Sequence, residues 1–402
     1  MTGKPQKATS KRLCMVVMAY YPLGETRVQR EAEALLAQGY QVDVICPQDI
    51  NEPLAASHRG VQVYRLPIRL SKGSLLRQFL NYLHFFVRAA VKLTQLHQRQ
   101  AYGGVQVHNL PDFLVFCTLA LKLQGVPIIL DLHDLMPEFY VSRFGRSPKS
   151  ALLRGLVCRQ ERWACRFADH VVTVSEHWRQ TLIKRGVPAH KCTVVMNVAD
   201  ERIFHPSKAR STPSLKDGSF RLIYHGTIVK RYGLDLAVQA LHQVRHEIPH
   251  IHLTILGVGD QVTALDQMIL ELGLNNQVSI YGERPVEDLP EIIQTADLGI
   301  VPYRDDVFTD SLLPTKLMEY AAMGLPAIAA RTTAMQAYFQ DTMVEFFEPN
   351  NVHDLARCIR LLYSSPERLA ALARGCESFN QQYNWSKTGA VYVALVDRLR
   401  TG

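Results

Sequence analysis

A lysine, a glutamate three positions later and a glycine stop lie within one short segment, LPTKLMEYAAMGLPAIAA, from Leu313 to Ala330. Pro314 lacks an N–H group and suits the first turn of a helix, whereas Gly324 and Pro326 favour its end. The segment therefore predicts a helix of about ten residues. Its N-terminus would carry unpaired N–H groups and a partial positive charge, which favour a bound phosphate. Lys316 adds a full positive charge to this predicted anion site.

Glu319 lies three positions after Lys316 and therefore on the same face of the predicted helix. A carboxylate beside phosphates is unfavourable unless it accepts hydrogen bonds from hydroxyl groups, such as those of a ribose. A nucleotide diphosphate offers both phosphates and ribose hydroxyls. The spacing alone also fits an ordinary surface Lys–Glu pair on a capped helix, which is the more frequent case.

Composition indicates two ordinary domains. The chain has 402 residues with 47% hydrophobic composition, enough for two α/β domains that each bury a core. The eight cysteines are scattered without a C-x-x-C motif, which is typical of a reduced cytosolic protein. The first twelve residues are polar and basic, so we expect no signal peptide and a cytoplasmic location, peripheral on the inner face of a membrane.

Positive charge is concentrated in the first half of the chain. Residues 1–205 hold 27 Lys and Arg against 15 Asp and Glu, a net +12, whereas the remainder holds 18 against 22, a net −4. The segments Arg65 to Gln100 and Val141 to Arg166 carry seven basic residues each, interleaved with apolar ones. This pattern predicts helices on an anionic membrane surface, although a core helix with a basic edge looks the same. No nucleic-acid recognition motif accompanies the charge, so we expect no nucleic-acid partner.

Two series of short apolar runs, separated by helical patterns, predict two parallel sheets. The polar segment Ala199 to Ser219, rich in Pro, Ser and Lys, predicts the linker between them. We expect an N-terminal acceptor-side domain at 1–205, a C-terminal nucleotide-sugar domain at 206–384, and a final helix at 385–402 that packs back on the first domain. Two Rossmann-like domains facing across a cleft would bind ligands at the carboxyl ends of their strands.

Several segments resemble one known family. PTKLMEYAAMGLPAIAA is similar to the donor-binding segment of family-four glycosyltransferases of the GT-B fold, whose usual form is P-x-K-x-x-E-Y-x-A-x-G-x-P. Val278 to Arg304 resembles the family's strand, glycine turn and ADLGIVPY run. Gly24 to Pro47 and Val126 to Glu138 resemble segments of its N-terminal half. The matches span nearly the whole chain in the family's order.

The resemblance implies roles for individual residues. His133 is placed near the transferred sugar, although it would otherwise brace its loop with Asp131 and Asp134. Lys230 and Arg231 are placed at the diphosphate. The predicted catalytic residues are His133, Lys316 and Arg231. The predicted donor-binding residues are Gly24, Thr227, Lys230, Arg231, Gly282, Ser311, Leu312, Pro314, Thr315, Lys316 and Glu319.

One position departs from the family pattern. Many members have a second glutamate eight positions before the residue equivalent to Glu319, where it contacts the sugar hydroxyls, and here that position is Ser311. We expect the backbone of residues 310–312 to take over part of this contact. The identity of the sugar therefore does not follow from the resemblance.

The family implies a retaining glycosyltransferase that needs neither cofactor nor metal and transfers a sugar from a nucleotide diphosphate to a hydroxyl. The basic, apolar first half suggests a lipid-linked or membrane-proximal glycan acceptor. Two alternatives share the fold: an epimerase that removes and re-adds a nucleotide diphosphate, and a non-catalytic binding protein. The presence of Lys316 and Glu319 argues against the non-catalytic alternative.

Overall fold

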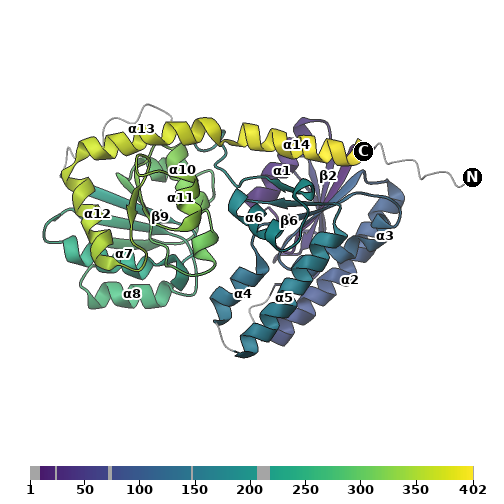
Figure 1. Ribbon diagram of the computed structural model, residues 1–402, viewed down its shortest axis with the longest axis horizontal. Coiled ribbons are helices and arrows are strands. Elements are labelled where there is room, and N and C mark those ends of the chain that lie inside the picture. Colours follow the sequence, from purple (N-terminus) through teal and green to yellow (C-terminus); the bar gives the residue numbers. More distant parts are fainter. Residues whose placement is uncertain (1–9, 23–24, 71–74, 146–147, 206–217, 402) are drawn as a thin grey trace, which may run out of the picture. The chain divides into compact units, whose positions relative to one another are not determined.

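The computed structural model of the chain describes residues 10–22, 25–70, 75–145, 148–205 and 218–401. It contains two compact units, one formed by Met1–Asn197 with Lys387–Gly402 and the other by Val198–Ser386. The sequence analysis placed the corresponding domain boundaries between residues 205 and 206 and between residues 384 and 385. Each unit has its own α/β architecture with helices around a sheet (Figure 1).

The first unit is built on an eight-stranded sheet in the order β3-β4-β2-β1-β5-β6-β7-β8. All neighbouring strands are parallel except β3 and β4, which are antiparallel. Strands β1 and β5 are buried throughout because helices cover both faces of the sheet. The strands are β1 (Arg12–Val16), β2 (Gln41–Pro47), β3 (Ala55–His58), β4 (Val61–Leu66), β5 (Gly104–His108), β6 (Ile128–Leu132), β7 (His170–Thr173) and β8 (Cys192–Val194).

Strands β3 and β4 were not predicted from the sequence. They form a hairpin at the sheet edge, and its turn places Arg59 and Gly60 at positive φ. The sequence AASH of β3 has no run of β-branched or aromatic residues, so a pattern of apolar residues does not reveal it.

Two helices of the first unit are long: α2 (Leu75–Arg99) follows strand β4, and α5 (Pro148–Phe167) follows helix α4 (Met136–Phe144). Helix α2 buries Phe85, Ala89, Leu93 and Leu96. The 3-10 helix η1 contacts both long helices, because Phe113 packs on Tyr82 of α2 and Phe116 packs on Phe167 of α5. The helices are α1 (Thr26–Ala37), α2 (Leu75–Arg99), η1 (Asp112–Thr118), α3 (Leu119–Lys122), α4 (Met136–Phe144), α5 (Pro148–Phe167), α6 (Glu176–Lys184) and η2 (Ala189–Lys191).

The second unit is built on a six-stranded parallel sheet in the order β11-β10-β9-β12-β13-β14. Its strands all match predicted apolar runs. They are β9 (Phe220–His225), β10 (Ile251–Leu256), β11 (Val278–Tyr281), β12 (Leu298–Val301), β13 (Ala327–Ala330) and β14 (Glu345–Phe347). The helices are η4 (Lys230–Tyr232), α7 (Leu234–Val244), α8 (Val262–Glu271), α9 (Leu289–Gln294), η5 (Thr309–Ser311), α10 (Thr315–Ala322), α11 (Thr333–Tyr338), α12 (Val352–Ser364) and α13 (Pro366–Gln382).

The final helix, α14 (Trp385–Thr401), begins in the second unit and continues in the first. At its start the Glu201 carboxylate accepts hydrogen bonds from the backbone N–H groups of Trp385 and Ser386, at 2.9 and 2.8 Å. In the first unit the Tyr392 hydroxyl donates to the side chain of Gln106 at 2.5 Å. This buried bond fixes α14 against strand β5.

Candidate active site

Lys316 lies at the second position of α10, and its side chain enters an aromatic enclosure. The residue is only 6% exposed. Its Nζ donates to the Tyr303 hydroxyl at 3.0 Å, and it lies over the rings of Tyr224, Tyr232 and Tyr303 at 4.7, 5.2 and 5.1 Å. Burial lowers the pKa of Lys316 to about 8, and the Glu319 carboxylate partly opposes this shift. The predicted anion site therefore has a buried ammonium close to its helix N-terminus.

Arg231 shares one of these rings with Lys316. Its Cζ lies 5.4 Å from the centre of the Tyr232 ring and 5.2 Å from that of Phe308. The fold therefore places Arg231 and Lys316, two of the predicted phosphate-binding residues, at the same ring, that of Tyr232. Lys230, by contrast, is exposed, and its carbonyl oxygen accepts a hydrogen bond from Arg304 at 3.2 Å.

The loop after β9 lies against the loop after β10. A Cβ at Gly257, whose φ is +151°, would lie 2.0 Å from the carbonyl oxygen of Gly226. Only glycine permits this approach. Thr227, in the first of these loops, is exposed at the carboxyl end of the sheet, and Gly282, after β11, faces open space.

Glu319 contacts the last residue of β9, because its Oε2 lies 3.3 Å from Nε2 of His225. Burial, together with the nearby Lys316 ammonium, lowers the pKa of His225 to about 3. The histidine is therefore neutral at pH 7.

The approach to α10 differs from the prediction in detail. Helix α10 spans eight residues and begins at Thr315, with Pro314 as its N-cap in an extended conformation (φ −75°, ψ 132°), so Pro314 precedes the first turn. The Ser311 hydroxyl donates to the carbonyl of Phe308, the N-cap residue of the 3-10 helix that contains Ser311, at 2.9 Å. Leu312 is partly exposed between the two helices.

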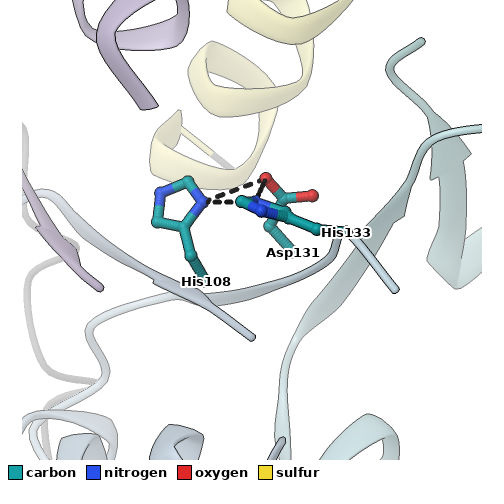
Figure 2. Close-up of side chains that lie close together, drawn as sticks. All are labelled: His108, Asp131 and His133. Atoms are coloured by element: carbon teal, nitrogen blue, oxygen red, sulfur yellow. Dashed lines mark hydrogen bonds and ion pairs between the residues drawn. The ribbon is translucent and has the colours of Figure 1, made fainter. Parts of the chain in front are cut away.

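In the first unit, His133 follows β6 and belongs to a tight cluster with two neighbours (Figure 2). Its Nε2 lies 3.2 Å from Oδ2 of Asp131 and 3.0 Å from Nδ1 of His108. His108 is the last residue of β5 and is paired in register with Asp131 of β6. Adjacent parallel strands thus bring together residues that are distant in the sequence.

A buried arginine holds the carboxylate of this cluster. Arg27 donates to both oxygens of Asp131 at 2.9 Å. Although burial alone would raise the pKa of Asp131, the Arg27 and His133 charges hold it well below its usual value. The Asp131 carboxylate in turn outweighs the effect of burial on His133 and raises the pKa of that imidazole. Burial lowers the pKa of His108 to about 4, so this ring is neutral.

Asn109 fixes the backbone of the same loop. Its Oδ1 accepts the N–H of His133 at 2.7 Å, and its Nδ2 donates to the carbonyl of Asp134 at 2.6 Å. Asn109 therefore braces the backbone of this loop, whereas the Asp131 carboxylate contacts the His133 side chain. His133 keeps some exposure, which leaves part of its ring accessible.

The spacing of His108, Asp131 and His133 would suit a metal ion. However, both oxygens of Asp131 already accept hydrogen bonds from Arg27. A metal-bound histidine normally donates its second N–H to an acceptor, whereas Nε2 of His108 has no hydrogen-bond partner among the described residues. We therefore interpret the group as a hydrogen-bonded cluster.

The remaining predicted residue, Gly24, lies outside the described residues. Four functional candidates were missed by the sequence-based reasoning: Tyr224, Tyr232, Tyr303 and His108. Each lies at or just after the carboxyl end of a strand, or in the loop that follows it. The sequence signal for these residues was their position at the carboxyl ends of predicted strands. Tyrosines at such positions also occur in ordinary hydrophobic cores.

Two family models match the chain. A glycosyl transferase 4-like domain matches residues 24–197, and the glycosyl transferases group 1 model matches residues 207–377. Amylovoran biosynthesis glycosyltransferase AmsK of Erwinia amylovora is 24% identical over 236 residues. That alignment spans 56% of this chain and 56% of the relative.

Solved structures have the same fold. The structure of sucrose-phosphate synthase from Thermosynechococcus elongatus has a TM-score of 0.78 at 19% identity, covering 96% of this chain and 98% of that one. The complex of HepE from Anabaena with UDP-glucose has a TM-score of 0.71 at 18% identity, covering 96% and 99%. Together with the two matched domains, this fold defines a glycosyltransferase of the GT-B type. The chain belongs to family four of these enzymes.

Proposed function

We propose that the protein transfers a sugar from a nucleotide diphosphate to a hydroxyl of a lipid-linked or membrane-proximal glycan acceptor. The transfer retains the anomeric configuration and needs no metal ion. The observation that supports the donor most strongly is the buried ammonium of Lys316 near the N-terminus of α10. An anion there would gain both a full charge and the helix N–H groups.

Positioning and charge stabilisation are the chemistry that these residues can supply. In the proposed reaction, Lys316 and Arg231 stabilise the negative charge of the departing diphosphate, as a metal would otherwise do. The acceptor hydroxyl attacks on the face from which the diphosphate leaves, and its proton passes to a diphosphate oxygen. We assign His133 to a sugar hydroxyl, because its Nε2 is held by Asp131 while part of the ring remains exposed.

Exposed apolar residues on α2 support the membrane part of the proposal. Phe79, Leu83, Val87 and Val91 are each about half exposed and recur every four residues, opposite the buried face of the helix. Helix α2 has no acidic residue. No helix in the described part of the chain is long and apolar enough to span a bilayer.

Helix α5 repeats this combination of charge and apolar surface. Leu152, Leu156 and Trp163 are half exposed or more. The acidic residue of the helix, Glu161, is buried and paired with Arg185 at 2.9 Å, so it does not offset the exposed arginines. Both features favour an anionic lipid surface.

The test is a transfer assay with labelled nucleotide sugars. A thermal-shift panel of nucleoside diphosphates first identifies the donor base, since a bound ligand stabilises the folded state. Transfer of label to lipid-linked glycans extracted from membranes, with the product's anomeric configuration read by NMR, is the expected result. Interconversion of free nucleotide sugars without transfer would instead indicate an epimerase and reject the proposal.

A further inference from the structure

The ammonium of Lys316 has few hydrogen-bond acceptors for a buried cation. A lysine ammonium carries three N–H donors. Among the described residues, Nζ of Lys316 donates to one acceptor, the hydroxyl of Tyr303, at 3.0 Å. With only 6% of the residue exposed, water replaces few of the missing bonds. The cation is instead stabilised by the faces of surrounding rings.

Three tyrosines from separate elements form this enclosure. Tyr224 lies in β9, Tyr232 ends η4, and Tyr303 follows β12. The rings of Tyr232 and Tyr303 are stacked, with centroids 4.5 Å apart and planes 11° from parallel. A ring stacked in this way has little freedom to turn, so the Tyr303 hydroxyl is held in a fixed position beside Nζ.

The backbone of the loop after β9 also lies close to the Lys316 side chain. A Cβ at Gly226, whose φ is +113°, would lie 3.3 Å from both Cε and Nζ of Lys316. The lysine side chain is therefore confined by the glycine on one side and by tyrosine rings on others.

We propose that Tyr303, supported by its stack on Tyr232, is the positioning residue for the phosphate-binding lysine. Its hydroxyl oxygen accepts one N–H of Lys316 and leaves the other donors for the diphosphate of the incoming donor. This inference rests on the proposed function, because it assigns the lysine to that diphosphate. Tyr303 itself acts through Lys316 and does not contact the reacting atoms.

The charged groups around Lys316 determine how pH acts on this arrangement. Glu319 on the same helix favours the ammonium, and His225 of β9 is neutral. Arg231 lies across the Tyr232 ring. The pKa values of Tyr224 and Tyr303 are raised by burial, so both hydroxyls stay protonated. Because burial lowers the pKa of Lys316 to about 8, part of the free enzyme carries a neutral amine above pH 7.

Binding of a diphosphate should therefore draw a proton onto Lys316. A hydroxyl acceptor stabilises the charged form more than the neutral form, since hydrogen bonds from a charged donor are the stronger ones. Removing the hydroxyl should favour the neutral amine in the free enzyme. The loss should be largest at alkaline pH and small near pH 6.5, where the lysine is charged in either case.

The experiment compares wild type with Tyr303→Phe, which keeps the ring and its stack. Donor kcat/KM is measured from pH 6.5 to 9.5, and UDP binding is measured by calorimetry in two buffers of different ionisation enthalpy. Tyr363→Phe is the matched control, because Tyr363 of α12 packs on Phe220 at the opposite end of β9. In Tyr303→Phe we expect the alkaline limb to move about 0.5 to 1 pH unit lower and the Kd for UDP at pH 8.5 to rise roughly three- to tenfold.

Three results would contradict the inference or the donor site on which it rests. A profile equal to that of wild type, or a loss that is equal at every pH, overturns the positioning role. If Tyr303→Phe does not fold, calorimetry of wild type decides, since no proton uptake on UDP binding at pH 8 also overturns it. A Lys316→Ala variant with full UDP affinity would reject the donor site itself, and so distinguishes failure of the proposed function from failure of this inference.

Discussion

Nδ1 of His108 lies 3.0 Å from Nε2 of His133, although the two residues are 25 positions apart in the chain. The contact exists because β5 and β6 are parallel neighbours that end at the same edge of the sheet. Both imidazoles lie beside the Asp131 carboxylate, yet one pKa is lowered and the other is raised. The partly exposed ring of the pair is thus the one that is protonated more readily.

Replacing His133 tests its proposed contact with the sugar. His133→Ala should lower kcat for transfer by roughly 10- to 100-fold, the cost of one hydrogen bond involving a charged group. The Kd for the nucleoside diphosphate that the thermal-shift panel selects should change little, because the proposed diphosphate site, Lys316 and Arg231, belongs to the second unit. The same measurements on His190→Ala, an exposed histidine, give the control. Equal losses in transfer and in affinity for the selected nucleoside diphosphate would indicate a loop-bracing role.

Replacing Lys316 tests the phosphate site. Lys316→Ala should weaken binding of the nucleoside diphosphate selected by thermal shift by about 1.5 to 3 kcal/mol, because the proposed charge-assisted bond to phosphate is lost. Thermal unfolding should show that the variant remains folded. Lys184→Ala, at the exposed end of α6, is the matched control. Unchanged kcat/KM with a verified donor contradicts the assignment.

Replacing Asp131 should destabilise the first unit. Asp131→Ala leaves the Arg27 guanidinium, 4% exposed, without its main counter-charge, and breaking such a buried pair costs about 3 to 5 kcal/mol. The measurement is urea unfolding followed by tryptophan fluorescence. Asp341→Ala, which breaks an exposed pair with Arg331, should cost about 1 kcal/mol or less. Similar costs for both variants would contradict burial as the reason.

The buried His225 should make the protein less stable in acid. Its pKa is lowered to about 3 in the folded state, whereas an unfolded histidine titrates near 6.5. Below pH 6.5 the unfolded chain therefore binds more protons, and stability falls by about 3 kcal/mol between pH 7 and 4. Urea midpoints across this range should fall less steeply in His225→Gln. Parallel curves for the two proteins would show that His225 does not contribute.

The exposed face of α2 should determine membrane affinity. Replacing Phe79, Leu83 and Val87 with serine should reduce co-sedimentation with anionic vesicles, since each side chain contributes about 1 kcal/mol of apolar burial. Salt should release wild type, and neutral vesicles should bind it less. The exposed Leu270→Ser in the second unit serves as control.

Charge on the same face is tested separately. Arg77→Gln with Arg88→Gln should weaken vesicle binding by about 2 kcal/mol. Lys92 is a poor choice for this test because its Nζ stacks over the Tyr64 ring at 4.7 Å. No affinity of wild type for anionic vesicles would favour a soluble acceptor.

The sequence by itself determined the elements that depend on local apolar periodicity and on residues that start or end a helix. The apolar runs predicted the six strands of the second sheet, and the Pro-x-Lys-x-x-Glu segment predicted α10 with its charged pair. These features follow from spacing within one strand or one helical turn, which the sequence displays directly.

Only the tertiary structure decided which residues meet. Tyr232 and Tyr303 stack around Lys316 because strands β9 and β12 are neighbours, and His108 reaches His133 because β5 and β6 are. The pairing order of strands depends on how whole sheets assemble, and the shifts in pKa depend on the burial that results. Arg27 illustrates this point. In the sequence it is an ordinary basic residue of a predicted helix, whereas in the fold it is the buried partner of Asp131.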